Sequence, residues 1–295
     1  MPQVFVENRK VKLTNLSKVL WPDDGFTKAD FIDYIEKVSP YMLPHLKDRP
    51  AVFTRYPDGI CGKAFYQKNI PEYAPAWINT FEAVSDKDKI IRYAVINDKD
   101  SLVWSANQAS IEIHPWLSRI DAPDTPDFAV FDFDPMENTD FEDARQLALA
   151  LKKLLDLAGL KGFAKTSGAT GLQVYVPLEP VYTYEDVRVF TGFFCRALEK
   201  TFPQKATTIR SVDKREGRVY LDYLQNIKGK TIIAPYSPRP RTGAPVSSPV
   251  TWEELEEGVV PDMFNIKSMP ERLRQKGDIF AGVLTQKQRI DRWIK

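Results

Sequence analysis

The sequence predicts an α/β fold, because short apolar or β-branched segments alternate with segments of helical periodicity along most of the chain. The clearest helix covers residues 141–158, where apolar residues recur at helical spacing up to Gly159. The clearest strand is Phe128–Asp134, an apolar run that lies between two prolines and is too short for a helix. The 295 residues suffice for one large domain or two packed lobes.

The first half of the chain is expected to contain one helix and several strands. Thr27 and Asp30 begin an amphipathic helix that we expect to end near Pro40. A glycine-punctuated loop is expected at 59–69. The expected strands of this half are 50–55, 90–96 and 110–113.

The second half begins with residues 121–127, which are rich in proline and aspartate and are interpreted as a linker. This linker suggests two approximate sub-lobes, 1–120 and 121–295, within a single domain of residues 1–295. Thr139 and Glu142 predict a capping box for the helix that follows. The remaining expected elements are a strand at 171–177, a helix at 185–202, a strand at 218–224 and a weakly helical region after residue 235.

The composition excludes several classes of protein. Lysine and arginine (41) nearly balance aspartate and glutamate (40), so a nucleic-acid site has to be a local patch. Cys61 and Cys195 match no metal-ligand or disulfide spacing and are expected to be reduced thiols. Neither a signal peptide nor an apolar run of about 18 residues is present, so we expect a cytoplasmic protein without a membrane partner.

Asp132 and Asp134 lie two residues apart at the end of the predicted strand, so their carboxylates face the same side. Two half-buried anions repel each other, and a hard divalent cation with oxygen ligands relieves this repulsion. Phosphatases, sugar-nucleotide transferases and polymerases all use such a pair, although Pro135 and Met136 differ from the phosphatase pattern. Capping of the next helix, or a solvated loop, is an open alternative.

Asp222 is a third carboxylate, and it is expected to lie among the alternating residues of a second strand. Three strand-borne carboxylates suit a two-metal phosphoryl transfer. From the pattern alone, a sheet-edge or salt-bridged aspartate is the commoner interpretation of Asp222.

Two further segments offer groups that could bind phosphate. Residues 165–173 are interpreted as a flexible glycine loop whose backbone N–H groups could hold phosphate, but the loop lacks the features of a Walker motif. Arg239 and Arg241 lie on a proline-restricted segment and could clamp a triphosphate. Surface arginines that only aid solubility are the alternative.

His114 follows Glu112 on an apolar strand, where a satisfied core histidine is the common outcome. Cations interleaved with aromatic rings are typical of single-stranded nucleic-acid binding, although core aromatics beside solvated lysines would give the same pattern. The residues of this kind near the N-terminus are Lys18, Lys28, Arg55, Lys63, Phe65, Tyr66 and Lys68.

Together these segments resemble the polymerase domain of bacterial ligase D, a non-homologous end-joining enzyme of the archaeo-eukaryotic primase superfamily. The resemblance extends over nearly the whole chain, and the order of its motifs makes chance similarity implausible. The matching segments are 13–22, 54–60, 65–69, 111–116, 131–135, 166–172, 221–223 and 234–239.

The resemblance implies a central, mostly antiparallel sheet that carries the three aspartates, is flanked by helices and is joined to an N-terminal DNA-contacting lobe. It implies a template-dependent nucleotidyltransferase that fills or extends broken DNA ends or gaps with a 5'-phosphate, prefers ribonucleotides among NTP and dNTP substrates, and uses two Mn²⁺ or Mg²⁺ ions. The implied partners are Ku and an ATP-dependent DNA ligase, and the implied location is the nucleoid. The chain would be a stand-alone polymerase or an excised domain.

The resemblance also assigns roles to residues. The implied metal ligands and catalytic residues are Asp132, Asp134 and Asp222, and the implied nucleotide-binding residues are His114, Lys165, Ser167, Gly168, Gln173, Arg239 and Arg241. The implied DNA contacts are Lys18 and Lys28 for the 5'-phosphate, Phe65 and Tyr66 for template stacking, and Arg55 and Lys68 nearby.

Two positions depart from the family pattern. Gln173 stands where the family usually has histidine and cannot carry a charge, and Gln225 stands where the family often has arginine. Two rival functions stay open: a primase-polymerase for gap repair without Ku, and a catalytically silent DNA-end-binding module.

Overall fold

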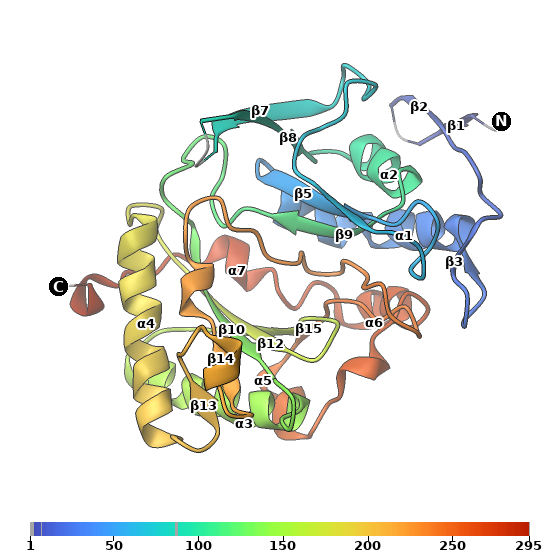
Figure 1. Ribbon diagram of the computed structural model, residues 1–295. Helices are drawn as coiled ribbons and strands as arrows, with labels where there is room; N and C mark the ends of the chain where they lie inside the picture. Colours follow the sequence, from blue (N-terminus) through green and yellow to red (C-terminus); the bar gives the residue numbers. More distant parts are fainter. Residues whose placement is uncertain (1–2, 7, 86–87, 295) are drawn as a thin grey trace. The chain divides into compact units, whose positions relative to one another are not determined.

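The computed structural model describes residues 3–6, 8–85 and 88–294, which form two compact units (Figure 1). Unit 1 comprises 1–121, 231–247 and 264–277, and unit 2 comprises 122–230, 248–263 and 278–295. The expected linker at 121–127 spans the first change of unit. Residues 231–247 and 264–277 belong to unit 1, although the expected boundary of the sub-lobes places them with 121–295. They pack with elements much earlier in the chain, and local sequence patterns do not reveal such long-range contacts.

Unit 1 contains an antiparallel sheet in which β5 pairs with β6, β8 and β9, and β8 pairs with β7. Two short hairpins, β1–β2 and β3–β4, precede this sheet in the chain. The strands are β1 Gln3–Phe5, β2 Lys10–Lys12, β3 Val19–Trp21, β4 Phe26–Thr27, β5 Pro50–Arg55, β6 Phe65–Gln67, β7 Asn79–Val84, β8 Ile90–Val95 and β9 Ser110–Pro115. The helices are α1 Lys28–Leu46, α2 Lys99–Asn107 and α6 Met269–Lys276.

Helix α1 begins as expected and ends later than expected. Thr27 accepts a hydrogen bond from the backbone N–H of Asp30, which completes the capping box. The helix continues through Pro40 and Pro44, so the expected end near Pro40 is wrong. A proline inside a helix removes one backbone bond, but the apolar face of α1 remains buried through Met42 and supplies the packing that sustains the helix.

Unit 2 contains a six-stranded sheet in the order β13-β14-β10-β12-β11-β15, antiparallel except for the β13–β14 pair. This confirms the expected mostly antiparallel sheet with flanking helices. The strands are β10 Phe128–Asp134, β11 Phe163–Thr166, β12 Leu172–Pro177, β13 Ala206–Thr207, β14 Val219–Leu221 and β15 Pro249–Val250. The α-helices are α3 Phe141–Leu157, α4 Tyr184–Thr201, α5 Trp252–Glu256 and α7 Gly282–Thr285, and the one-turn 3₁₀ helices are Val212–Lys214, Tyr223–Gln225, Pro261–Met263 and Asp291–Trp293.

The structure corrects the expected cap of α3. Asp140, not Thr139, caps the helix, and its carboxylate accepts from the backbone N–H groups of Glu142 and Asp143. The Thr139 hydroxyl instead bonds the backbone of Met136. Both residues match a capping sequence, and the turn before the helix decides which one is used.

Several other elements differ from expectation. Residues 65–67 of the expected loop form β6, and α2, β7 and the short strands β1–β4, β13 and β15 were not expected. Strand β14 ends at Leu221 rather than at 224, because the chain turns into the 3₁₀ helix Tyr223–Gln225. Strand β11 was not expected, since its four residues are too few for a periodic pattern. Within the part of the chain that is described, no helix has the length and apolar character needed to cross a membrane.

Candidate active site

Strand β10 carries two carboxylates on one face and two phenylalanines on the other. Phe131 and Phe133 are almost fully buried, and the Phe131 ring packs edge-on against Phe190 of α4, with ring centroids 5.9 Å apart. Asp132 and Asp134 alternate with them and are partly buried. The strand lies between β14 and β12, so the sheet fixes both carboxylates from either side.

Asp222 is held beside Asp132 by the backbone. It directly follows β14 rather than lying within a strand, and its backbone N–H donates to the carbonyl oxygen of Asp132 over 2.9 Å. The Tyr220 hydroxyl donates to Asp222 Oδ1 over 3.1 Å, and Lys230 Nζ lies 3.9 Å from Asp222 Oδ2. The expected third carboxylate therefore joins the same sheet end as the first two.

The three carboxylates interact electrostatically. Burial raises the pKa of Asp132 well above its ordinary value, and the charges of Asp134 and Asp222 raise it further. A hydrogen bond from Gln173 and the charge of Lys165 act in the opposite direction. Among residues 3–6, 8–85 and 88–294, no three His, Cys, Asp or Glu side chains form a preformed metal cage. Three mutually repelling oxygen donors nevertheless suit a hard divalent cation.

Gln173 connects this cluster to a buried lysine. It lies opposite Asp132 across β10–β12 and opposite Lys165 across β11–β12. Its Nε2 donates to Asp132 Oδ1 over 3.0 Å, and its Oε1 accepts from Lys165 Nζ. Lys165 lies in β11 and is fully buried, so the expectation that it begins a flexible loop is wrong.

The residues after β11 form a tight turn against the end of β10. The Ser167 hydroxyl oxygen accepts from the backbone N–H groups of Ala169 (3.1 Å) and Gly171 (3.0 Å), and Gly168 has φ +73°. A Cβ atom at Gly171 would lie 2.7 Å from the carbonyl oxygen of Phe133 and 3.4 Å from Asp134 Oδ1. Only glycine lets this turn approach the carboxylate-bearing strand end so closely.

In unit 1, Glu112 brings His114 and Arg239 together. Glu112 Oε1 lies 3.0 Å from Arg239 Nη1, and Glu112 Oε2 lies 3.6 Å from His114 Nε2. Burial raises the pKa of Glu112, but the His114 hydrogen bond and the Arg239 charge outweigh burial, so its pKa lies below the ordinary value. Sequence reasoning missed Glu112, and its alternation with His114 on β9 was the available signal.

The segment that carries Arg239 is fixed to β9. Ser237 Oγ accepts from the backbone N–H of Ile113 over 3.0 Å, and Tyr236 has φ +67°, which turns the chain there. Arg239 Nε is buried without a hydrogen-bond partner among the described residues, whereas Arg241 is exposed. A buried N–H that lacks a partner is costly, so it is a candidate donor to a ligand.

Three cations of unit 1 share a cavity of about 190 Å³, lined also by Asn107 and Gln108. Each cation donates to a backbone carbonyl: Lys28 Nζ to Thr14 O (2.7 Å), Lys18 Nζ to Pro57 O (2.6 Å) and Arg55 Nε to Gln108 O (2.8 Å). Lys18 Nζ also forms an ion pair with the exposed Asp58, over 2.8 Å. Burial, together with the charges of Lys18 and Arg55, lowers the pKa of Lys28 to about 8. Like charges concentrated in one cavity favour an anionic ligand. We call this cavity the basic pocket.

Aromatic side chains of β6 are exposed in the same unit. Phe65 and Tyr66 are 43% and 52% exposed. The Arg55 guanidinium lies 5.0 Å from the centre of the Phe65 ring, and Lys68 Nζ lies 5.9 Å from that of Tyr66. The expected association of cations with exposed rings is therefore present in unit 1.

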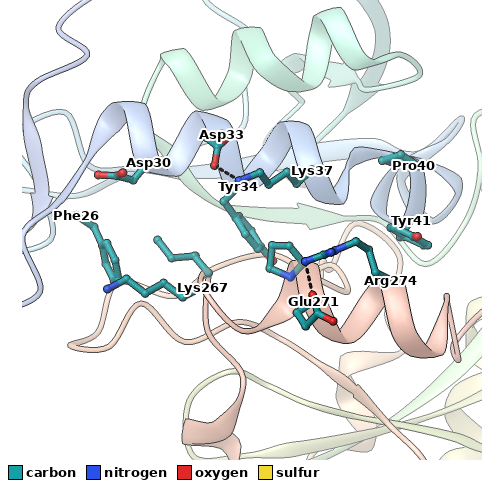
Figure 2. A pocket seen from close by; sticks show the side chains of 12 residues that line it. Phe26, Asp30, Asp33, Tyr34, Lys37, Pro40, Tyr41, Lys267, Glu271 and Arg274 are labelled. Atoms are coloured by element: carbon teal, nitrogen blue, oxygen red, sulfur yellow. Dashed lines mark hydrogen bonds and ion pairs between the residues drawn. The ribbon is translucent and has the colours of Figure 1, made fainter.

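A larger cavity of about 630 Å³ lies between α1 and α6 (Figure 2). Its charged residues include both signs, and four of them form two ion pairs: Lys37 Nζ lies 2.6 Å from Asp33 Oδ2, and Arg274 pairs with Glu271. Because its charged residues are of both signs, this cavity has no concentration of one charge comparable to the three cations that line the basic pocket.

Comparison with known proteins identifies relatives that match most of the chain. The family model described as "LigD, primase-polymerase domain" matches residues 27–280. A bifunctional non-homologous end joining protein LigD of Bacillus subtilis is 38% identical over 269 residues, which cover 91% of this chain and 43% of that protein. A multifunctional LigD of Mycolicibacterium smegmatis is 33% identical over 276 residues, which cover 92% of this chain and 36% of that protein. The chain thus spans less than half the length of these relatives.

A solved structure gives the same result for the fold. The polymerase domain from Mycobacterium tuberculosis Ligase D, determined in complex with DNA, matches with a TM-score of 0.89 and 34% sequence identity. The match covers 96% of this chain and all of that chain.

Proposed function

The chain belongs to the LigD primase-polymerase domain family, which makes it a nucleotidyltransferase of the polymerase type, and we propose that it adds nucleotides to DNA ends or gaps under the direction of a template. In this proposal it prefers ribonucleotides and serves non-homologous end joining. The observation that carries the proposal is the cluster of Asp132, Asp134 and Asp222 at one sheet end, where burial and mutual repulsion raise the pKa of Asp132.

We assign the metal site to this cluster. Asp132, Asp134 and Asp222 would hold two divalent cations, Mn²⁺ or Mg²⁺, which would supply Lewis acidity at the phosphate and stabilise the leaving pyrophosphate. The protein itself supplies orientation, since the sheet fixes Asp132 and Asp134 and the backbone bond to Asp132 fixes Asp222. The primer 3'-hydroxyl would then attack the α-phosphate in line.

Nucleotide-binding groups are proposed within each unit separately. His114, Arg239 and Arg241 of unit 1 would contact the triphosphate, since Arg239 has a buried N–H in need of an acceptor. Within unit 2, the turn with Ser167 and Gly168 is proposed to bind nucleotide phosphate through its backbone donors, and Gln173 and Lys165 are proposed to support that turn's site, Lys165 by way of Gln173.

The DNA contacts are proposed for unit 1. Lys18 and Lys28 in the basic pocket would bind the 5'-phosphate at a recessed end, with Arg55 beside them. Phe65 and Tyr66 would stack on template bases, and Lys68 would contact the backbone. Ku and an ATP-dependent DNA ligase are the proposed partners, since the relatives are named as end-joining proteins and extend beyond the matched region.

Extension of a labelled primer on a gapped duplex tests the proposal. NTPs or dNTPs would be supplied with Mn²⁺ or Mg²⁺, on duplexes with and without the 5'-phosphate. We expect metal-dependent extension, faster with NTPs and with the phosphate, and none by the Asp132→Ala, Asp134→Ala double variant. Extension by the double variant would overturn the metal assignment.

The same assay separates the rival functions. A gap-repair primase-polymerase would extend the primer but show no stimulation by added Ku. A silent end-binding module would bind the 5'-phosphorylated gap, which fluorescence anisotropy measures, and would add no nucleotide with any metal.

A further inference from the structure

Lys165 is a charged side chain in an unusual environment. It is fully buried in β11, and its Nζ lies 5.6 Å from the centre of the Tyr175 ring. Burial of an ammonium group is costly unless its N–H groups find partners. One such partner is Gln173 Oε1, and Gln173 is itself only 4% exposed.

Only one orientation of the Gln173 amide is consistent with its hydrogen bonds. A lysine ammonium has donors only, so it can face the oxygen of the Gln173 amide but not the NH₂ group. The NH₂ group then faces the opposite strand, where Nε2 donates to Asp132 Oδ1 over 3.0 Å. If the amide turned over, its oxygen would face a carboxylate oxygen, and two acceptors repel.

The sheet register explains why these three residues meet. Lys165 is directly opposite Gln173 in the β11–β12 pair, and Gln173 is directly opposite Asp132 in the β10–β12 pair. Directly opposite side chains on one face of an antiparallel pair lie close enough to interact. The three side chains therefore form a row across three neighbouring strands.

From this row we propose that Lys165 is a positioning residue, which fixes the Gln173 amide so that it holds Asp132 for metal binding. The inference deepens the proposed function and rests on it. Lys165 acts through Gln173 and does not touch the nucleotide, consistent with its complete burial. Gln173 engages one carboxylate oxygen of Asp132, and such outer partners commonly change metal affinity about 10- to 100-fold.

The row would also accommodate a histidine at position 173. A neutral imidazole, like an amide, has one acceptor and one donor, so either side chain can accept from Lys165 and donate to Asp132. By donating to position 173, Lys165 would fix the tautomer of a histidine there, as it fixes the amide orientation of Gln173.

Two possible roles of Lys165, a nearby positive charge or a positioning residue, predict opposite changes in metal affinity when its side chain is removed. If Lys165 acted only as a nearby positive charge, its loss would tighten binding of a cation to the carboxylate cluster. If it acts through Gln173, its loss weakens that binding. The sign of the change in metal affinity therefore separates the two roles.

The test is a double-mutant cycle on Mn²⁺ affinity, measured by isothermal titration calorimetry with the purified full chain. The variants are Lys165→Met, Gln173→Leu and the two combined, with Lys161→Met as the control at an exposed lysine. We expect each single variant to weaken Mn²⁺ binding roughly tenfold and the double variant to be no weaker than Gln173→Leu. Gln173→His should bind Mn²⁺ within about threefold of the wild type, since imidazole preserves the row.

Several results would overturn the inference: unchanged or tighter binding by Lys165→Met, or losses that multiply in the double variant. Should a single variant fail to fold, the double variant replaces both polar partners with apolar groups, a change that proteins tolerate better. Wild-type affinity in that double variant would then overturn the inference. Asp132→Ala is the reference: if it binds Mn²⁺ like the wild type, or if the wild type binds none, the proposed function fails and the inference fails with it.

Discussion

The two units each concentrate one sign of charge, but they do so in different ways. In unit 2 the carboxylates of Asp132, Asp134 and Asp222 lie at the ends of paired strands, where backbone pairing fixes them. In unit 1 the cations of the basic pocket lie on separate segments, and backbone carbonyls hold their side-chain nitrogens. Each concentration of like charge costs free energy that a ligand of opposite charge would offset, and this is why both are proposed as binding sites.

The two sites therefore differ in how rigidly their side chains are held and in how well they should tolerate substitutions. A site fixed by a sheet should lose most of its function when one ligand or its close-packed neighbour changes. A site fixed by side-chain hydrogen bonds should lose function gradually and should respond to pH. Substitutions in the two units therefore test this contrast directly.

The largest effect is expected at Asp222. Asp222→Asn removes one anionic ligand, and we expect nucleotide addition to fall about 10²–10³-fold, as when a group that stabilises transition-state charge is lost. Single-turnover primer extension measures the rate. The exposed Asp156 of α3 gives a matched control, Asp156→Asn, with unchanged extension. An Asp222→Asn variant as active as this control would contradict the assignment.

A smaller loss is expected at Gly171. In Gly171→Ala the added Cβ would lie 2.7 Å from the carbonyl oxygen of Phe133, so the turn or the end of β10 must move. Displacement of reacting groups by about 1 Å costs up to about 10²-fold in rate, and we expect a loss of about that size. Gly258→Ala, where φ is +86° and a Cβ meets no atom within 4 Å, strains the backbone without a clash and so controls for a general loss of stability. Normal extension by Gly171→Ala would mean that this close approach is not needed.

In the basic pocket, the preference for a 5'-phosphate should depend on pH through Lys28. The pKa of Lys28 is lowered to about 8, so the free protein loses this positive charge as pH rises through 8. We expect the affinity ratio of phosphorylated to unphosphorylated gaps, measured by anisotropy, to fall up to about tenfold from pH 7 to pH 9. Lys28→Arg keeps its charge over this range and should flatten the profile. Identical profiles for both proteins would argue against Lys28 as the phosphate ligand.

The smallest effect is expected at the exposed rings. Phe65→Ala or Tyr66→Ala should weaken binding of a single-stranded template overhang about fivefold, the lower end for loss of one base-stacking contact. Phe193→Ala removes a similarly exposed ring of α4 and serves as the control. The stacking role would be refuted by equal overhang affinity in all three variants.

Much of the fold could be predicted from local patterns. The apolar run Phe128–Asp134 forms β10 over its whole expected length, and the periodicity of 141–158 forms α3. The prediction was wrong where tertiary packing overrides a local rule. Helix α1 passes through Pro40 because its buried face continues, and residues 163–166 become β11 because β12 and β15 pair with them.

The candidate site could be predicted in part. The alternation of Asp132 and Asp134 gave their shared face, since strand geometry has a period of two. Alternation on one strand could have related Glu112 to His114, but the pairing of Glu112 with Arg239 and of Lys165 with Gln173 depends on segments distant in sequence or on separate strands, which spacing does not reveal. For the same reason, spacing did not place Lys18, Lys28 and Arg55 in one pocket, although the family resemblance implied a common role for Lys18 and Lys28.

The most direct test of the central claim is anomalous diffraction from crystals of the protein grown with Mn²⁺ and a non-hydrolysable NTP. The account predicts two Mn²⁺ peaks at about 2 Å from carboxylate oxygens of Asp132, Asp134 and Asp222, the usual distance for small hard cations. Loss of these peaks in an Asp132→Ala crystal would complete the assignment. Peaks that avoid all three aspartates, while the NTP is bound, would contradict it.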